Sequence, residues 1–532
     1  MFIDNDMRFK IETPNGTFVG HENNCVAEFL GIRYGNLKRW EPPTDVITTK
    51  EDIFICDTYS PSGIQVVDRM EKASLFTQSE DNLQLNIWTK DIYVKSKPVM
   101  VWIHGGGAIA GGTYDPLYRG ENYVRALQDN EDVVFVNFNY RLGVLGLINL
   151  ESLSGYSDRY QYSMNLATLD QIHALKWVQN NIAYFGGDPE NVTVFGQSSG
   201  SSSIAALLTI PEGRKYFQRA ICHSGNLFER QISVEKAKEY SKMMLDILGC
   251  KTMDEALALK DYDIKHKLEG IYENFDGPAL QRVADGITVP VNGFESLLNG
   301  DAANICLMLG NTNGETDRVA VDRDNFPQVL GDEGKIFGLL ELTSEMTRGA
   351  ATGIDIRTQS EAITAYLNAD PDNDRVKRMM DLTNDLFYIK GNTMIAEAQS
   401  KWSDKVFLYQ WNWAPDMTLQ HEIYGKDCWY SPYGRAAHCT ELPFVLKNLD
   451  AMEECSGPSE NMPKLLSDQM HKAWYSFAKK GDPNNELIPV WNSYNETDRQ
   501  VMYIDEVWTL VKDPKKEDRL LLKQIKHNGC LI

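Results

Sequence analysis

Continuous apolar runs alternate along the chain with segments whose apolar residues recur at helical spacing. The runs at residues 99–103, 133–138 and 192–195 are typical of strands buried on both faces of a parallel sheet. Between the last two, a single apolar stripe predicts a helix packed against that sheet. The stripe is formed by Leu166, Leu169, Ile172, Leu175, Val178 and Ile182. This alternation predicts an α/β architecture with a large, mostly parallel central sheet flanked by helices.

Two longer segments, residues 233–298 and 326–401, are rich in Lys, Glu, Asp, Ala and Leu at helical spacing. We expect them to be helical insertions that lie above the sheet and cover an active site. The chain contains no repeat, low-complexity tract or Pro/Gly/Ser-rich linker. We therefore expect residues 1–532 to form a single domain.

The charge of the chain limits its partners. Asp and Glu number 75 against 53 Lys and Arg, a formal net charge of −22. Nucleic acid and anionic membranes both require a positive surface, so neither is an expected partner. The first residues, MFIDNDMRFKIETPNGTFVG, lack the pattern of a signal peptide. No apolar stretch approaches the roughly 18 residues that span a bilayer.

The cysteine pattern points the same way. Nine cysteines occur without a CxxC pair, and their spacing fits neither a disulfide framework nor a zinc site. Reduced thiols are the simplest interpretation. Together with the N-terminal sequence, this predicts a cytoplasmic protein without a metal.

A candidate nucleophile lies in the pattern G-x-S-x-G. It consists of Gly196, Gln197, Ser198, Ser199 and Gly200, directly after the strand at 192–195 and directly before the helix-forming segment SSSIAALL. In a nucleophile elbow the turn is too sharp for side chains at the two Gly positions, and it lifts the Ser hydroxyl clear of the sheet. A plain Gly/Ser loop is the alternative. The strand–turn–helix context favours Ser198 as a nucleophile.

A second motif, His104-Gly105-Gly106-Gly107, follows the strand at 99–103. Glycines leave backbone N–H groups bare and let a substrate carbonyl approach closely. The N–H groups of Gly106, Gly107 and Ser199 are therefore candidates for an oxyanion hole. A phosphate loop would require a following GK[ST], which is absent.

The residues alone leave the acid and base of a triad open. His266, His421, His438, His471 and His527 all follow the nucleophile, as the expected chain order requires. His223 is a rival base, but we expect it at the end of a strand and interpret it as structural. Composition does not choose among these residues or select one carboxylate from 75 acidic residues.

Beyond the two site motifs, several segments resemble the type-B carboxylesterase/cholinesterase family. They are FLGIRYG (29–35), SEDNLQLNIW (79–88), NYRLGVLG (139–146), LKWVQNNIAYFGGDPENVTV before the elbow, HSG (223–225), GNTNGE (310–315), AAHCTELPFVL (436–446) and WYSFAKKGDPN (474–484). The resemblance implies an α/β-hydrolase fold and a serine carboxylesterase that needs no metal or organic cofactor. It implies that Glu315 is the acid of the triad and His438 its base. It also implies a hydrogen bond from Ser224 to Glu315.

Departures from the family pattern bear on the substrate. Asn82 replaces a disulfide Cys, Gln197 replaces the Glu before the nucleophile, Ser199 replaces an Ala, and Ala108 stands where Phe is common. Cholinesterases carry a Trp in the loop that matches residues 64–82, and this loop has none. Cation recognition needs an aromatic face or a nearby carboxylate.

We therefore expect neutral esters of short- or medium-chain acids as the small-molecule partners. Ala108 leaves two alternatives open, extra room beside the oxyanion hole or a space refilled by another side chain. A cholinesterase, a lipase or amidase, and a non-catalytic adhesion protein of the same family are the alternative functions.

The resemblance also predicts two ion pairs in the scaffold. Arg141 is expected to pair with Asp170, and Arg39 with Glu80. Buried charges persist only when they are paired and hydrogen-bonded.

Overall fold

The computed structural model describes most of the chain. The described residues are 8–65, 77–228, 231–269, 280–317, 360–369, 375–414, 431, 433–450 and 461–525.

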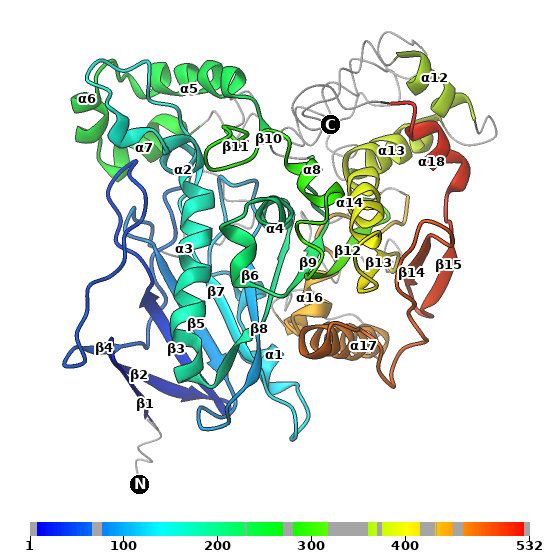
Figure 1. The fold of residues 1–532 in the computed structure, drawn as a ribbon, viewed down its shortest axis with the longest axis horizontal. Helices are drawn as coiled ribbons and strands as arrows, with labels where there is room; N and C mark the ends of the chain where they lie inside the picture. The colour runs from blue at the N-terminus through cyan, green and yellow to red at the C-terminus, as the bar shows by residue number, and fades with distance from the viewer. Residues whose placement is uncertain are drawn as a thin grey trace.

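A large mixed sheet runs through the molecule (Figure 1). Its thirteen described strands are β1 (Arg8–Thr13), β2 (Gly16–Asn23), β3 (Val26–Arg33), β4 (Ile53–Ile55), β5 (Gln84–Thr89), β6 (Lys97–Ile103), β7 (Val134–Phe138), β8 (Gly187–Gln197), β9 (Arg219–His223), β12 (Cys306–Thr312), β13 (Val406–Trp411), β14 (Gln500–Ile504) and β15 (Thr509–Lys512). Their order is β1-β2-β3-β5-β7-β6-β8-β9-β12-β13-β14-β15, with β4 beside β2. The run from β7 to β14 is parallel throughout. The predicted α/β class with a mostly parallel sheet is confirmed.

Each central strand sends alternate side chains into two separate cores. On β6, Val99, Val101 and Ile103 pack on one face with residues of α3 (Leu166–Asn181) and α4 (Ser199–Thr209). Met100 and Trp102 point to the other face and pack with α17 (Asn461–Lys480). All five side chains are at most 1% exposed. Burial on both faces explains why these strands read as continuous apolar runs.

The remaining helices lie around the sheet and its ends (Figure 1). They are α1 (Glu121–Arg125), α2 (Gly143–Gly146), α5 (Val234–Leu248), α6 (Met253–Ala258), α7 (Asp261–Leu268), α8 (Gly293–Leu298), α12 (Ser360–Asn368), α13 (Arg375–Asn384), α14 (Lys390–Ser400), α16 (Leu442–Val445) and α18 (Lys516–Leu522). Short 3₁₀ turns are η2 (Pro116–Tyr118), η3 (Asp158–Tyr160), η4 (Ser163–Asn165), η5 (Ile182–Phe185) and η6 (Gly213–Tyr216). A π-helix, η7 (Asp385–Ile389), joins α13 to α14.

The predicted insertions are helical where they are described, and residues 326–359 lie outside the described part. The first insertion differs by one short strand, β11 (Arg282–Val283), which pairs with β10 (Gln231–Ile232). The side chain of Asn165 explains this strand. It accepts a hydrogen bond from the N–H of Val283 and donates one to its carbonyl, each at 2.9 Å.

Both predicted ion pairs are present. Asp170 accepts from Nε of Arg141 at 2.8 Å and from its Nη2 at 2.6 Å, and the two side chains are 0% and 3% exposed. Arg39 pairs with Glu80. The six described cysteines are all free thiols: Cys25, Cys56, Cys222, Cys250, Cys306 and Cys439. Cys428, Cys455 and Cys530 lie outside the described residues.

Among the described helices, none is both long and apolar enough to cross a membrane.

Candidate active site

The G-x-S-x-G segment forms a tight turn between β8 and α4. Ser198 has φ 55° and ψ −123°, a backbone conformation that L-residues rarely adopt. Its N–H is fixed by the carbonyl of His223 at 2.9 Å. A Cβ on Gly196 would lie 2.5 Å from the carbonyl oxygen of Ile103, and one on Gly200 would lie closer still to the same oxygen. The glycines are therefore required by the close approach of β6.

The glycine loop after β6 leaves donors beside this turn. Gly106 and Gly107 have φ of 106° and 70°. The carbonyl of Gly106 accepts from the N–H of Ala110, which folds the loop back on itself. In the described part of the chain, the N–H groups of Gly106, Gly107 and Ser199 make no hydrogen bond to another protein atom. They are positioned to serve as donors to an oxyanion.

His104 has a structural place in this loop. Its ring stacks on Tyr140 with centroids 4.4 Å apart, and its carbonyl accepts from the Tyr140 hydroxyl at 2.8 Å. Burial lowers the pKa of His104 to about 4, so its ring is neutral at physiological pH.

Glu315 and His438 come together although 123 positions separate them in the sequence. Nδ1 of His438 lies 2.5 Å from Oε2 of Glu315. Oε1 of Glu315 accepts from the backbone N–H of Thr312 at 2.7 Å. Burial opposes the charged imidazolium, but the acidic groups of Cys439, Tyr388 and Glu315 outweigh it and hold the pKa of His438 well above its ordinary value.

Backbone hydrogen bonds join the loop of the acid to the loop of the base. Gly314 forms a parallel bridge with Ala437, and its N–H donates to the carbonyl of Ala436 at 2.9 Å. The N–H of Ala436 donates to the side-chain oxygen of Asn313 at 2.8 Å. The separation of Glu315 from His438 is therefore set by backbone as well as by their own contact.

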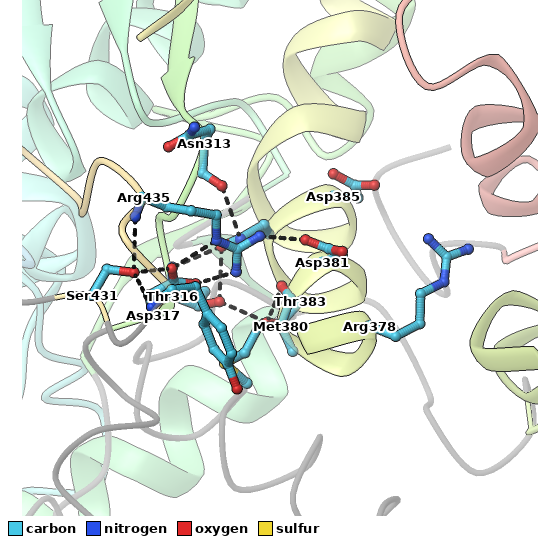
Figure 2. A network of polar contacts seen from close by, with 12 residues as sticks. Asn313, Thr316, Asp317, Arg378, Met380, Asp381, Thr383, Asp385, Ser431 and Arg435 are labelled. Atoms are coloured by element: carbon cyan, nitrogen blue, oxygen red, sulfur yellow. Dashed lines mark hydrogen bonds and ion pairs between the residues drawn. The ribbon is translucent and has the colours of Figure 1, made fainter. Parts of the chain in front are cut away.

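A buried charged network reinforces this junction (Figure 2). Arg435, three residues before His438, pairs with Asp317 and with Asp381 of α13. Asp317, two residues after Glu315, is 0% exposed and also accepts from the hydroxyl of Ser431 at 2.6 Å.

Thr316 ties the same junction to the end of α13. Its N–H donates to Oδ1 of Asn384 at 2.7 Å, and its hydroxyl lies 2.6 Å from that of Thr383. We call the set Thr316, Asp317, Asp381, Asn384, Ser431 and Arg435 the acid–base clamp.

No hydrogen bond joins Ser198 to His438 among the contacts of the described residues. Nε2 of His438 faces Nε2 of Gln197 instead, at 2.9 Å. Gln197 is 1% exposed and directly precedes Ser198 in the elbow. Its side-chain amide is the group that contacts the imidazole. The amide N–H of Gln197 can donate to Nε2 only in the neutral tautomer whose proton lies on Nδ1, toward Glu315.

The expected bond from Ser224 to Glu315 is also absent. Within the described residues the Ser224 hydroxyl is buried without a hydrogen-bond partner. The two carboxylate oxygens of Glu315 are already occupied by Thr312 and His438.

His223 is structural in its contacts, as interpreted. It ends β9, is fully buried, and lies between the Tyr409 hydroxyl at 2.7 Å and Nε1 of Trp474 at 3.0 Å.

The space beside Ala108 is largely filled. A cavity of only about 20 Å³ lies there, and Gln281 and Arg282 are among the residues that line it. This is room for roughly one water molecule. Of the two alternatives for Ala108, the structure favours the refilled space.

Sequence reasoning missed the acid–base clamp and Tyr388, whose ring lies 5.4 Å from that of His438. The charged residues Asp317 and Arg435 stand close in sequence to Glu315 and His438, and that proximity was the available signal. Tyr388 belongs to the π-helix η7, and such helical bulges are frequent at functional sites.

Comparison with known proteins agrees with this geometry. The sequence profile of the carboxylesterase family matches residues 8–521. The para-nitrobenzyl esterase of Bacillus subtilis (strain 168) is 32% identical over 539 residues, which cover 96% of this chain and 97% of that protein. The phenmedipham hydrolase of Pseudarthrobacter oxydans is 28% identical, with 88% of each chain covered.

Solved structures give the same result. A para-nitrobenzyl esterase superposes with a TM-score of 0.80 at 31% identity and covers 96% of this chain and 99% of its own. A carboxylesterase of Geobacillus stearothermophilus gives 0.80 at 27% identity with the same coverage. The family resemblance and the α/β-hydrolase fold predicted from the motifs are confirmed. The chain belongs to the carboxylesterase family and is a serine hydrolase of carboxylic esters.

Proposed function

We propose that Ser198, His438 and Glu315 are the catalytic triad of this esterase. The observation that carries the proposal is the pair of the buried Glu315 and the partly exposed His438 beside the strained turn of Ser198. The tautomer implied by Gln197 supports it, because a general base must present an unprotonated Nε2. The side-chain amide of Gln197 must move away from Nε2 of His438 before this nitrogen can accept the proton of Ser198.

The proposed cycle consists of two acyl transfers. His438 takes the Ser198 proton as the hydroxyl attacks the ester carbonyl, and Gly106, Gly107 and Ser199 donate their N–H groups to the oxyanion. His438 then protonates the leaving alcohol. Water repeats the sequence on the acyl-enzyme and releases the acid. Glu315 keeps the imidazole oriented and stabilises its charged form.

We propose neutral esters of short- or medium-chain acids as substrates. Gln197 places a neutral amide, rather than a carboxylate, against His438. A cationic alcohol group therefore gains no charge partner from this residue. The para-nitrobenzyl group in the name of one relative is uncharged, which agrees with this preference.

We further propose a single domain spanning the chain and a cytoplasmic location. The six free cysteines of the described residues support the location, since an oxidising compartment favours disulfides.

Active-site labelling tests the triad. A fluorophosphonate should attach to the peptide that contains Ser198, and Ser198→Ala should abolish labelling. Ser201→Ala is the matched control, because this buried serine of α4 bonds the carbonyl of Gly225 and faces no triad residue in the described contacts. Labelling of another serine, or labelling of the Ser198→Ala variant, would refute the assignment.

A pair of esters tests the substrate preference. The comparison is kcat/KM for a choline ester and for an uncharged ester of the same acid with a similar leaving group. We expect the uncharged ester to react faster. A tenfold preference for the choline ester, about 1.4 kcal/mol of transition-state binding, would instead favour a cholinesterase.

A further inference from the structure

A cavity of about 330 Å³ lies away from the triad, between α14, the strands β13 and β14, and α18. Its apolar wall consists of Ile389, Met394, Leu408, Val501, Leu522 and Ile525. None of its lining residues belongs to the proposed triad or oxyanion hole. The volume is about twice that of an engineered cavity that binds benzene, roughly 150 Å³, and reaches the roughly 300 Å³ at which ligand pockets begin.

Cationic side chains outnumber carboxylates around the cavity, whereas acidic residues predominate in the chain as a whole. The whole chain has 75 acidic and 53 basic residues, whereas the cavity lining has three carboxylates and five cationic side chains. All three carboxylates are already paired: Asp385 with Lys515, Glu397 with Arg499, and Asp513 with Arg519. Two cations, Lys390 and Lys523, remain without a carboxylate among the described residues.

Lys390 is the better placed of the two. Lys523 is exposed, whereas Lys390 begins α14 and is half-buried. The ammonium of Lys390 donates to the backbone carbonyl of Ile525. Burial without a compensating charge lowers the pKa of Lys390 to about 8. An anion bound here would supply the opposite charge that the half-buried ammonium of Lys390 lacks among the described residues.

Asn311 supplies a second donor to the lining of the cavity. It lies on β12 and is only 6% exposed. Its Oδ1 accepts from Nδ2 of Asn392 at 3.0 Å, while its own Nδ2 has no hydrogen-bond partner in the described structure. A buried donor without a partner is costly unless a ligand or water satisfies it.

We propose that this cavity binds a small amphipathic carboxylate, with its carboxyl group on Lys390 and its alkyl chain along the apolar wall. From the volume, the ligand is a linear acid of about eight carbons or a compound of similar size. The N–H of Asn311 is a second donor for an oxygen atom of the ligand. The site is separate from the triad, so an acid bound here does not compete directly with the ester.

Binding is measured by calorimetry on the full chain after fluorophosphonate has blocked the reactive serine. Octanoate should bind with a stoichiometry near one, and octylammonium of the same chain length should not bind. Octanol should bind at least about tenfold more weakly than octanoate, because a hydrogen bond to a charged group is stronger than one between neutral groups. Equal affinity for octanol, or loss of octanoate binding on blocking the serine, would overturn the proposal.

Variants locate the carboxyl group. Lys390→Met should weaken octanoate binding at least about tenfold, while Lys390→Arg, which keeps the charge, should stay within a few-fold of the parent. Lys242→Met on the exposed side of α5 is the matched control and should bind as the parent does. Unchanged affinity in Lys390→Met would overturn the proposal, and the retained fold of each variant is checked by its melting temperature. Failure of the serine to label would count against the triad alone, since octanoate binding is read separately.

Discussion

The two halves of the active site are held together by different means. The nucleophile half, formed by the elbow and the glycine loop, depends on backbone: positive φ angles and glycines pressed against the carbonyl of Ile103. The acid–base half depends on side chains, with the partly buried Arg435 paired with both Asp317 and Asp381. An added side-chain atom should therefore destabilise the nucleophile half, and the loss of a charged side chain should destabilise the acid–base half.

The largest effect on activity is expected from adding one methyl group to the nucleophile half. In Gly200→Ala the new Cβ meets the carbonyl oxygen of Ile103, which is backbone and has no flexible end that could move away. Overpacking of this kind costs about 1–3 kcal/mol or more, and esterase activity should be lost with it. Urea unfolding and kcat/KM measure the two effects.

Gly434→Ala is the control for Gly200→Ala. Gly434 has φ 63° and nothing within 4 Å of an added Cβ. Only the backbone strain of a left-handed residue remains, about 1–2 kcal/mol, and activity should persist. Equal losses in both variants would show that the close approach of β6 is unimportant.

Removal of the central charge of the clamp should have the next largest effect. Arg435→Met leaves Asp317 and Asp381 without their cation, and an orphaned buried charge costs about 3–5 kcal/mol. Because Asp317 and Arg435 flank Glu315 and His438 in sequence, kcat of the folded fraction should fall as well. The measurement pairs unfolding with kcat corrected for titrated active sites.

Asp170→Ala separates stability from catalysis. It orphans Arg141 in the same way and should cost a similar 3–5 kcal/mol, yet Asp170 lies on α3 and makes no contact with the triad among the described contacts. Its kcat per active site should stay near that of the parent. Unchanged unfolding would contradict the buried pair, and an equal loss of kcat would mean that the clamp has no special role in positioning the base.

A smaller effect is expected from pH. The neutral form of His438 is the active base and its pKa is raised, so kcat/KM should rise with pH and reach half its maximum above 6.5. His104 and His471 have pKa values lowered by burial to about 4 and about 3, so neither accounts for this rise of kcat/KM with pH. An inflection at or below 6.5 would contradict the raised pKa of His438.

The smallest effect is expected at Gln197, where the two halves meet. Gln197→Ala removes one neutral hydrogen bond to His438, worth about 1 kcal/mol, so kcat/KM should change by no more than about fivefold. Gln197→Glu has the same size but adds a negative charge, so the rise of kcat/KM with pH should move to higher pH. If the pH of half-maximal kcat/KM is unchanged in Gln197→Glu, the 2.9 Å contact between residue 197 and His438 does not persist in solution.

The same contrast explains what could be predicted from the sequence. The nucleophile half is contiguous, so a strand, two glycines and a helix-forming segment were enough to predict Ser198 and its turn. The acid–base half joins residues 313–317, 375–384 and 431–438, and no local pattern connects them. Glu315 and His438 followed only from family resemblance.

Side-chain detail could not be predicted from the resemblance. It predicted a bond from Ser224 to Glu315, but the oxygens of Glu315 are satisfied by Thr312 and His438. The departure of this chain at Gln197 also puts an amide against Nε2 of His438, a contact that the resemblance did not predict. The Arg141–Asp170 pair was predicted correctly because it depends on two charges that need each other inside the core.

The acyl-enzyme itself gives the most direct test of the central claim. The protein is mixed with a p-nitrophenyl ester of a short-chain acid, quenched in acid within the first turnover, digested and examined by mass spectrometry. We expect a burst of one p-nitrophenol per chain and an acyl group on the peptide that contains Ser198, with both lost in His438→Ala. An acyl group on another residue, or a full burst in His438→Ala, would contradict it.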